Sequence, residues 1–292
     1  MANDALDTIR TWLTRQLDVE QQSWFDAQLE VLTNTPSGKA LHLAFGFTSR
    51  KLGRADLLVT LSELEAAYPS LSGCAPHNWS VDLTARVIFL VTASRTLNAW
   101  ETPFASLVRH GDVAEQIACF SALPFLPDSD KIDGLVGEGL RTNMRAVFEA
   151  IAHNNPYPAA RFDDHRWNHM VLKALFIGAR LYPIIGLDKR ANAELARILC
   201  DYANERWAAG RPVTPELWRC VGPFADGPML RDLARAARDG TPDERAAVAL
   251  ALAAARAPEA AMILTEMPDE KAAIEVGALD WNTLASKLET AA

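Results

Sequence analysis

Apolar residues recur along this chain with the spacing of one face of a helix. Leu6, Ile9, Leu13 and Leu17 form one such stripe, and residues 86–97 are apolar nearly all round. Alternation with a period of two, which is typical of half-buried strands, does not persist anywhere. We therefore predict an all-α protein, and we expect residues 86–97 to form a buried helix.

Helix ends are marked by proline and glycine. Thr followed by Pro occurs at residues 102–103, 214–215 and 241–242. A Thr hydroxyl can cap the first turn, and Pro has no N–H to waste at the first helical position, so each pair predicts a helix start. Gly210 and Gly240 follow helical stretches and predict helix ends.

Residues 111–123 and 240–252 align without gaps. Each is a glycine turn, an acidic helix start and a helix with small residues at packing spacings. The shared positions are Gly111/Gly240, Glu115/Glu244, Ala118/Ala247, Ala122/Ala251 and Leu123/Leu252. Small residues let a neighbouring helix approach closely, as in stacked helical hairpins. We predict an irregular HEAT-like α-α superhelix, that is, a solenoid of stacked helical hairpins.

The order of the segments suggests two regions. We expect an N-terminal helical region over residues 1–100, packed on a HEAT-like helical domain over residues 101–292. Proline, glycine and serine mark residues 69–80 as a loop, and three glycines mark residues 128–139 as a second loop.

Composition narrows the functional classes. The net charge of −8 argues against nucleic acid, which is bound mainly through Lys and Arg. None of the four cysteines is paired as CxxC, which favours a reducing compartment without disulfides. The N-terminus lacks the apolar core of a signal peptide, and the longest strongly apolar run, residues 87–91, is far too short to span a membrane. We expect a cytoplasmic protein.

Residues 153–176 carry the densest polar chemistry. Asn155 and Tyr157 both precede a proline, which disfavours helix and predicts an extended connector over residues 153–158. Asp163 or Asp164 would then cap a buried helix. In a purely structural interpretation, the polar side chains of the connector bond backbone groups that irregular chain leaves unpaired.

A metal site is a second interpretation of the same residues. His165 and His169 are four apart and so share a helical face, with His153, Asp163 and Asp164 as further candidate ligands. The HRWNH sequence lacks the catalytic Glu of HExxH, and such a pair at a helix start is common by accident.

A polar pocket is a third interpretation. A helix N-terminus offers free N–H groups, and Tyr157, Trp167 and Asn168 could line a site beside it. Lys173 lies in an apolar helix and needs a partner or a path to the surface. In the second polar cluster, residues 186–211, we expect Asp188 to cap a helix whose charged side chains form a solvated ladder.

Catalytic templates mostly fail. The sequence contains no GxSxG, no P-loop and no GxGxxG motif, and no cysteine has an obvious cationic neighbour. An enzyme would have to use His153 or His165 as a general base near Tyr157 and the acids. No catalytic residue is assigned, and the sequence favours a protein that is not an enzyme.

Four segments of the chain, taken in order, resemble the EboA-domain proteins of bacteria. They are HNNPYP, FDDHRWNHMVLKALF, GLDKRANAELARILCDYANERWAAGR and PELWR. The resemblance is sharpest over residues 148–221. The residues that match the family motif are His153, Asn154, Asn155, Tyr157, Trp167, Asn168, Lys173, Arg190, Asn192, Tyr202, Glu205, Arg206 and Trp207. The family usually has Gln where this chain has His169, which weakens the metal interpretation.

The resemblance implies a helical protein without an assigned reaction. EboA-domain proteins are encoded beside a UbiA-type membrane prenyltransferase, a TIM-barrel metal-dependent hydrolase and sugar-metabolism-like enzymes. These clusters are linked to making or exporting specialised metabolites, including the precursor of a cyanobacterial sunscreen pigment. The resemblance carries over no catalytic residue.

Together these observations predict a non-catalytic protein that binds a metabolite or a pathway enzyme at a polar site built from the two clusters. Two alternatives stay open: a metal-dependent or His-based enzyme, and a structural adaptor whose polar residues all make inter-helix hydrogen bonds. We expect no cofactor and no nucleic acid, and peripheral contact with a membrane prenyltransferase fits the resemblance. The candidate ligand-binding residues are His153, Asn154, Asn155, Tyr157, Trp167, Asn168, Lys173, Arg190, Asn192, Tyr202, Glu205 and Arg206.

Overall fold

The computed structural model describes residues 2–69, 71, 74–127 and 130–290. Within these ranges the regular structure is helical, with 19 α-helices and five short 3₁₀ helices. The nearest approach to a sheet there is one isolated bridge between Asp56 and Ser80. The predicted all-α class is confirmed.

The chain divides into two compact units, Met1–Arg161 and Phe162–Ala292. Residues 1–100 therefore share a unit with residues 101–161. The expected boundary near residue 100 stays a prediction, because a division into compact units does not show which segments fold independently. The two units are described separately below.

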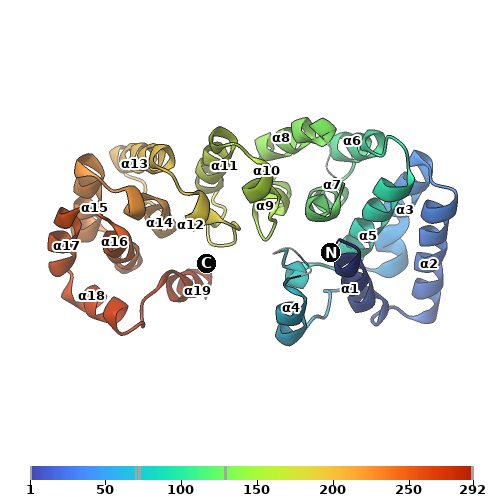
Figure 1. Cartoon of the computed structure of the whole chain (residues 1–292), viewed down its shortest axis with the longest axis horizontal. Helices are drawn as coiled ribbons and strands as arrows, with labels where there is room; N and C mark the ends of the chain where they lie inside the picture. Colours follow the sequence, from blue (N-terminus) through green and yellow to red (C-terminus); the bar gives the residue numbers. More distant parts are fainter. Residues whose placement is uncertain (1, 70, 72–73, 128–129, 291–292) are drawn as a thin grey trace. The chain divides into compact units, whose positions relative to one another are not determined.

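The first unit holds ten α-helices in its described part (Figure 1). They are α1 (Ala2–Thr14), α2 (Val19–Asn34), α3 (Gly38–Leu52), α4 (Leu61–Ala67), α5 (Val81–Thr96), α6 (Glu101–His110), α7 (Val113–Ser121), α8 (Asp133–Arg141), α9 (Arg145–Ala152) and α10 (Tyr157–Arg161). Its 3₁₀ helices are η1 (Pro76–Asn78), η2 (Leu123–Phe125) and η3 (Asp130–Ile132).

The second unit holds nine α-helices in its described part. They are α11 (Asp164–Phe176), α12 (Leu187–Arg190), α13 (Ala193–Ala208), α14 (Trp218–Val221), α15 (Gly227–Asp239), α16 (Pro242–Ala254), α17 (Pro258–Thr265), α18 (Pro268–Glu275) and α19 (Trp281–Thr290). Its 3₁₀ helices are η4 (Pro215–Leu217) and η5 (Gly222–Phe224). No described helix of either unit is long and apolar enough to cross a bilayer.

Helix α5 forms the centre of the first unit. It is buried nearly all round, as the apolar run over residues 86–97 predicts, and it packs against α1, α2, α3 and α7 (Figure 1). Two charged residues of α5, Asp82 and Arg86, are buried in this core. Arg86 donates to Asp82 (2.9 Å), to the hydroxyl of Ser49 (2.9 Å) and to the carbonyl of Phe45 (3.2 Å). A buried pair is tolerated when its other hydrogen-bonding atoms are satisfied in this way.

Helices α7 and α16 play matching parts in the two units. Helix α7 packs against α5, α6 and α9, and α16 packs against α14, α15, α17 and α19. A tight turn precedes each of them, and an added Cβ at Gly111 or Gly240 would lie 2.4 Å from the carbonyl oxygen of Leu107 or Ala236. The two segments that align in sequence therefore form equivalent helical hairpins, α6–α7 and α15–α16.

Several expected helix ends are correct and others are displaced. Helix α16 begins at Pro242 with Thr241 as its cap, η4 begins at Pro215, and Gly210 follows α13 with a positive φ of 64°. Thr102 is different: α6 already begins at Glu101, so the Thr lies inside the first turn.

Three further expectations need correction. The second loop, predicted over residues 128–139, is helical from residue 130 on, since η3 leads directly into α8. Residues 128–129 lie outside the described residues.

Asp188 does not cap the helix of the second polar cluster, because Asn192 accepts the N–H of Leu195 and caps α13 instead. Residues 153–158 are not extended throughout. Tyr157 begins the short helix α10. A residue that precedes proline is disfavoured in a helix, but here it occupies only the first helical position.

Candidate functional site

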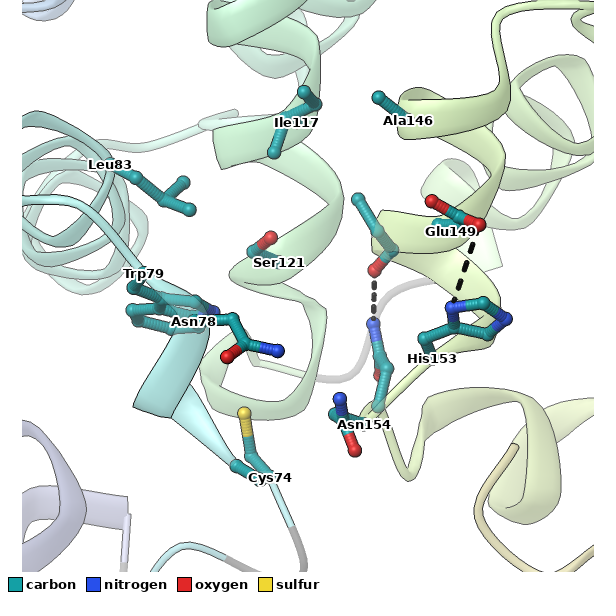
Figure 2. Close-up of a pocket in the computed structure, with 13 residues that line it drawn as sticks. Cys74, Asn78, Trp79, Leu83, Ile117, Ser121, Ala146, Glu149, His153 and Asn154 are labelled. Carbon is teal, nitrogen blue, oxygen red and sulfur yellow. Dashed lines mark hydrogen bonds and ion pairs between the residues drawn. The ribbon is translucent and has the colours of Figure 1, made fainter. Parts of the chain in front are cut away.

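A pocket of about 230 Å³ opens in the first unit, between helices α7 and α9 and the segment that leads into α5 (Figure 2). It collects the start of the predicted polar stretch and several residues far from it in sequence. The lining residues are Cys74, Ala75, Asn78, Trp79, Leu83, Ile117, Ser121, Ala146, Glu149, Ala150, His153, Asn154 and Asn155.

The end of α9 brings the predicted residues to this pocket. The helix ends at Ala152, and His153 is already extended. Asn154 then adopts a left-handed conformation with φ of 49°, which Asn tolerates better than most residues. This reversal turns the chain out of α9, so that His153 and Asn154 line the pocket rather than continue the helix (Figure 2).

Asn155 anchors this turn. Its Nδ2 donates to the carbonyls of Phe120 (3.1 Å) and Ala150 (3.0 Å), and its Oδ1 accepts the N–H of Tyr157 (3.0 Å). The side chain is 3% exposed, so these bonds satisfy polar atoms that water cannot reach. Asn155 ties the end of α7 to α9 and fixes the floor of the pocket.

Tyr157 belongs to the same support. Its hydroxyl donates to Oδ1 of Asp133 at 2.6 Å. Burial, and then this bond to a carboxylate, raise the pKa of Tyr157 well above its usual range. A neutral, buried phenol held in this way is suited to bracing α10 against α8, not to general-base chemistry.

Ser121 is the most informative polar residue of the pocket. It lies on α7, is 8% exposed, and its hydroxyl makes no hydrogen bond within the described part of the chain. Among the described residues, the fully buried side-chain atoms without a partner are Nε1 of Trp167 and Trp218 and Oε1 of Glu244, so the Ser121 hydroxyl is reached by solvent in the pocket. A hydroxyl that lines a pocket and has no partner is available to a bound molecule.

Glu149 and His153 form the polar wall opposite Trp79. Oε1 of Glu149 accepts from Nε of Arg145 at 2.7 Å, and Nδ1 of His153 lies 3.9 Å from the same oxygen. The other oxygen, Oε2, accepts no hydrogen bond within the described ranges. Opposite these groups, burial raises the pKa of Cys74 to about 12, so its thiol is unsuited to act as a nucleophile at neutral pH.

The predicted residues of the second unit form a different cluster. The amides of Asn168 and Asn192 exchange hydrogen bonds at 3.2 and 2.9 Å, which joins α11 to the start of α13. Arg190 donates to the carbonyl of Phe162 (2.8 Å), and its guanidinium lies 4.9 Å from the ring centroid of the buried Trp167. Most of these polar atoms therefore serve helix packing.

The remaining candidates of this unit also have structural neighbours. Arg206 donates twice to the carbonyl of Pro212, at 3.0 and 2.9 Å, and so holds the chain that follows α13. The Tyr202 hydroxyl donates to the carbonyl of Leu175 at 3.4 Å. Burial lowers the pKa of Lys173, and Glu205 is exposed to solvent.

The metal interpretation gains no support from the structure. The rings of His165 and His169 meet edge to face with centroids 4.2 Å apart, while Asp163 caps α11 by accepting the N–H of Arg166. Among the described residues, no group of three or more His, Cys, Asp or Glu side chains could hold a metal ion. A pocket of about 290 Å³ lies beside the pair, lined also by Asn168 and Asn192.

The structure thus assigns the twelve predicted residues to two units. His153, Asn154, Asn155 and Tyr157 lie in the first unit, and the other eight lie in the second. The sequence pattern does not reveal the residues that share the pocket with His153. One signal could have revealed Ser121: in the internal alignment it stands where the second copy has Leu250.

The chain matches the family model described as Metabolite traffic protein EboA over residues 5–222, which is more than half of its length. The chain belongs to the EboA family. The match covers the whole first unit from Ala5 and continues in the second unit as far as η5, so the pocket lies entirely inside the EboA region. No curated protein and no solved structure matches the chain.

Proposed function

We propose that this EboA protein binds a small metabolite of its pathway, without catalysis, in the pocket between α7 and α9. The observation that carries the proposal is the unpartnered hydroxyl of Ser121 in a pocket that also contains His153 and Asn154 of the EboA motif. Concave sites with a few convergent polar groups are typical of ligand binding.

The lack of catalytic arrangement favours binding over turnover. His153 lies beside Glu149, but the neighbouring thiol of Cys74 is unreactive and the phenol of Tyr157 is engaged with Asp133. An acid–base enzyme needs a base aimed at a reacting group, together with donors for developing charge. A binding protein needs only shape and hydrogen-bonding groups, which the pocket has.

Family membership supports a role in metabolite traffic. We propose that the matching hairpins α6–α7 and α15–α16 belong to an irregular HEAT-like solenoid, which would support the pocket on a rigid scaffold. The motif residues of the second unit, such as Asn168, Asn192 and Arg190, would then stabilise this scaffold by the inter-helix bonds described above. These inter-helix bonds also fit the adaptor alternative, in which the second unit presents a surface to a pathway enzyme.

The test is native mass spectrometry of the protein purified gently from a host that carries its own gene cluster. We expect a bound small molecule on the wild type and its loss in Ala146→Trp, because Ala146 is an exposed residue at the pocket whose enlargement fills the space without disturbing the core. Ala66→Trp is the matched control, since Ala66 is an exposed residue of α4 outside the pocket.

Retention of the same molecule by Ala146→Trp would contradict binding in this pocket. A bare mass that appears together with a stoichiometric protein partner would favour the adaptor instead. Circular dichroism and thermal melts of both variants exclude loss of the fold as the cause of a negative result.

A further inference from the structure

The charges around the pocket are one-sided. Glu149 is the one carboxylate among the described lining residues, and none of those residues is a lysine or an arginine. The whole chain is acidic as well, with a net charge of −8. An anionic ligand would therefore enter without a counter-ion and would face a carboxylate.

Glu149 retains the capacity to bind a cation. Its partner Arg145 lies outside the lining and its side chain is 54% exposed, so this pair resembles the surface ion pairs that contribute little to stability. Nδ1 of His153, at 3.9 Å, is too distant for a hydrogen bond. With Oε2 open, the carboxylate can accept an ammonium N–H without losing Arg145.

The apolar part of the lining suits a flat body. Trp79, Leu83 and Ile117 supply it, and Figure 2 shows Leu83 and Trp79 on the side of the pocket away from Glu149 and His153. The indole of Trp79 meets Phe125 edge-on, with centroids 6.4 Å apart and an interplanar angle of 87°, which fixes its orientation. An apolar indole wall on one side and a carboxylate on the other suit a ligand with an apolar ring at one end and a cation at the other.

Size and hydrogen bonding complete the description. About 230 Å³ is below the range of roughly 300–1,000 Å³ in which drug-sized ligands are buried, so a single ring with a short side chain is the appropriate scale. The hydroxyl of Ser121 and the amide of Asn154 can each donate and accept, which suits a hydroxyl group on the ligand.

We infer that the pocket takes a small organic ammonium compound with one flat ring, and that Glu149 is its counter-ion. This inference rests on the proposed function, because it names the ligand class for the same pocket. The ring packs on the wall of Trp79, Leu83 and Ile117, and the ammonium group donates to Oε2 of Glu149. A hydroxyl on the ring reaches Ser121 or Asn154.

Three probes that share a phenol ring and differ in charge test the inference: tyramine (cation), tyrosol (neutral) and 4-hydroxyphenylacetate (anion). Each is titrated into the full chain while the indole N–H signal of Trp79, assigned with Trp79→Phe, is followed by NMR. We expect tyramine to bind roughly tenfold more tightly than tyrosol, and 4-hydroxyphenylacetate to bind most weakly.

Glu149→Gln separates charge from shape. It removes the counter-ion but keeps an acceptor, so we expect the affinities for tyramine and tyrosol to converge to within about twofold. Glu138→Gln is the matched control, because Glu138 pairs with Arg109 on the surface of the same unit, outside the pocket. The control should keep the wild-type order of affinities.

Two outcomes would overturn the ammonium assignment. Probes that shift the Trp79 signal with equal or reversed affinities would reject the ligand class while leaving the pocket as a binding site. Absence of any shift at Trp79 with all three probes would also reject the class, and the native mass spectrometry of the wild type and Ala146→Trp would then decide the proposed function on its own.

Discussion

The two matching hairpins use one pattern in two ways. In the first unit, Asp112 and Glu115 form a reciprocal capping box at the start of α7. In the second unit, the equivalent Glu244 is 6% exposed, and its Oε1 has no hydrogen-bond partner in the described part of the chain. The same residue type at the same helix position therefore completes a capping box in one helix, and in the other it is buried with one carboxyl oxygen unpaired.

A second difference lies deeper in the helices. Position 121 of α7 is Ser, and the equivalent position 250 of α16 is Leu, and both are buried. In α16 the Leu is part of an apolar core, whereas in α7 the Ser borders the pocket. The comparison of Ser121 with Leu250 indicates a functional position more directly than the sequence of either helix does alone.

The largest effect should come from the closest helix approach. Gly222 of η5 packs on α16, and an added Cβ would lie 2.5 Å from the carbonyl oxygen and 2.7 Å from Cα of Ala251. Because backbone atoms cannot move aside, we expect Gly222→Ala to lower the free energy of unfolding by about 3 kcal/mol or more. Urea denaturation followed by circular dichroism measures this.

The first unit offers a milder counterpart at Gly139, where an added Cβ would meet side-chain atoms of Phe120 and Ile151. These can shift, so Gly139→Ala should cost less than Gly222→Ala. Gly227→Ala is the control, since nothing lies within 4 Å of its Cβ position, and it should be neutral or slightly stabilising. Equal losses at residues 222 and 139 would show that α7 and α16 are packed with the same tolerance.

An intermediate effect is expected at the buried carboxyl. Burial raises the pKa of Glu244, and the Trp218 indole and the Thr241 backbone offset this only in part. The folded state then holds the proton more tightly than the unfolded state. Stability therefore falls as pH rises from the usual Glu range through the raised pKa.

Glu244→Gln removes this titration. The difference in free energy of unfolding, variant minus wild type, should grow with pH and reach about 1 kcal/mol in favour of the variant near neutrality. Urea midpoints from pH 4 to pH 8 measure it. Parallel curves for the two proteins would mean that Glu244 is ionised equally in both states.

The smallest effect on stability, with the largest on binding, is expected for Ser121→Leu. It places in α7 the residue that α16 has at the equivalent position and removes an unpartnered hydroxyl. We expect a change in stability below about 1 kcal/mol, together with loss of ligand. The reverse substitution, Leu250→Ser, should destabilise by roughly 2–4 kcal/mol because it opens the core.

Thermal melts and native mass spectra of the two variants report stability and binding separately. A strong loss of stability in Ser121→Leu would show that the space beside α7 is packed tightly and does not serve as a pocket.

Local chemistry explains which parts of the fold could be predicted. Helical spacing and the buried stretch within α5 follow from the apolar pattern, and Thr241 with Pro242 specifies a helix start by atoms within one turn. The cap of α13 was missed because Asp188 and Asn192 are equally good caps in sequence. Only the packed structure directs Asp188 to Arg219, with two contacts of 2.6 Å, and leaves Asn192 to cap the helix.

The candidate site was predictable only in part. His153 and Asn154 were identified because several rare polar residues stand together in sequence. Ser121 and Trp79 were not, since each is ordinary in its own segment and gains meaning only when α7, α9 and the start of α5 meet. Pockets assembled from distant segments depend on tertiary packing, which no local pattern encodes.

The four cysteines have a practical consequence. All are buried and unpaired, and burial raises the pKa of every one of them. Mild alkylating reagents and oxidants need an exposed thiolate, so the native chain should remain unlabelled without any Cys being removed. A single Cys introduced at position 146 would then be the one residue that reacts with a thiol-specific fluorophore. The labelled protein would report the entry of ligand into the pocket, with no need to remove the native cysteines.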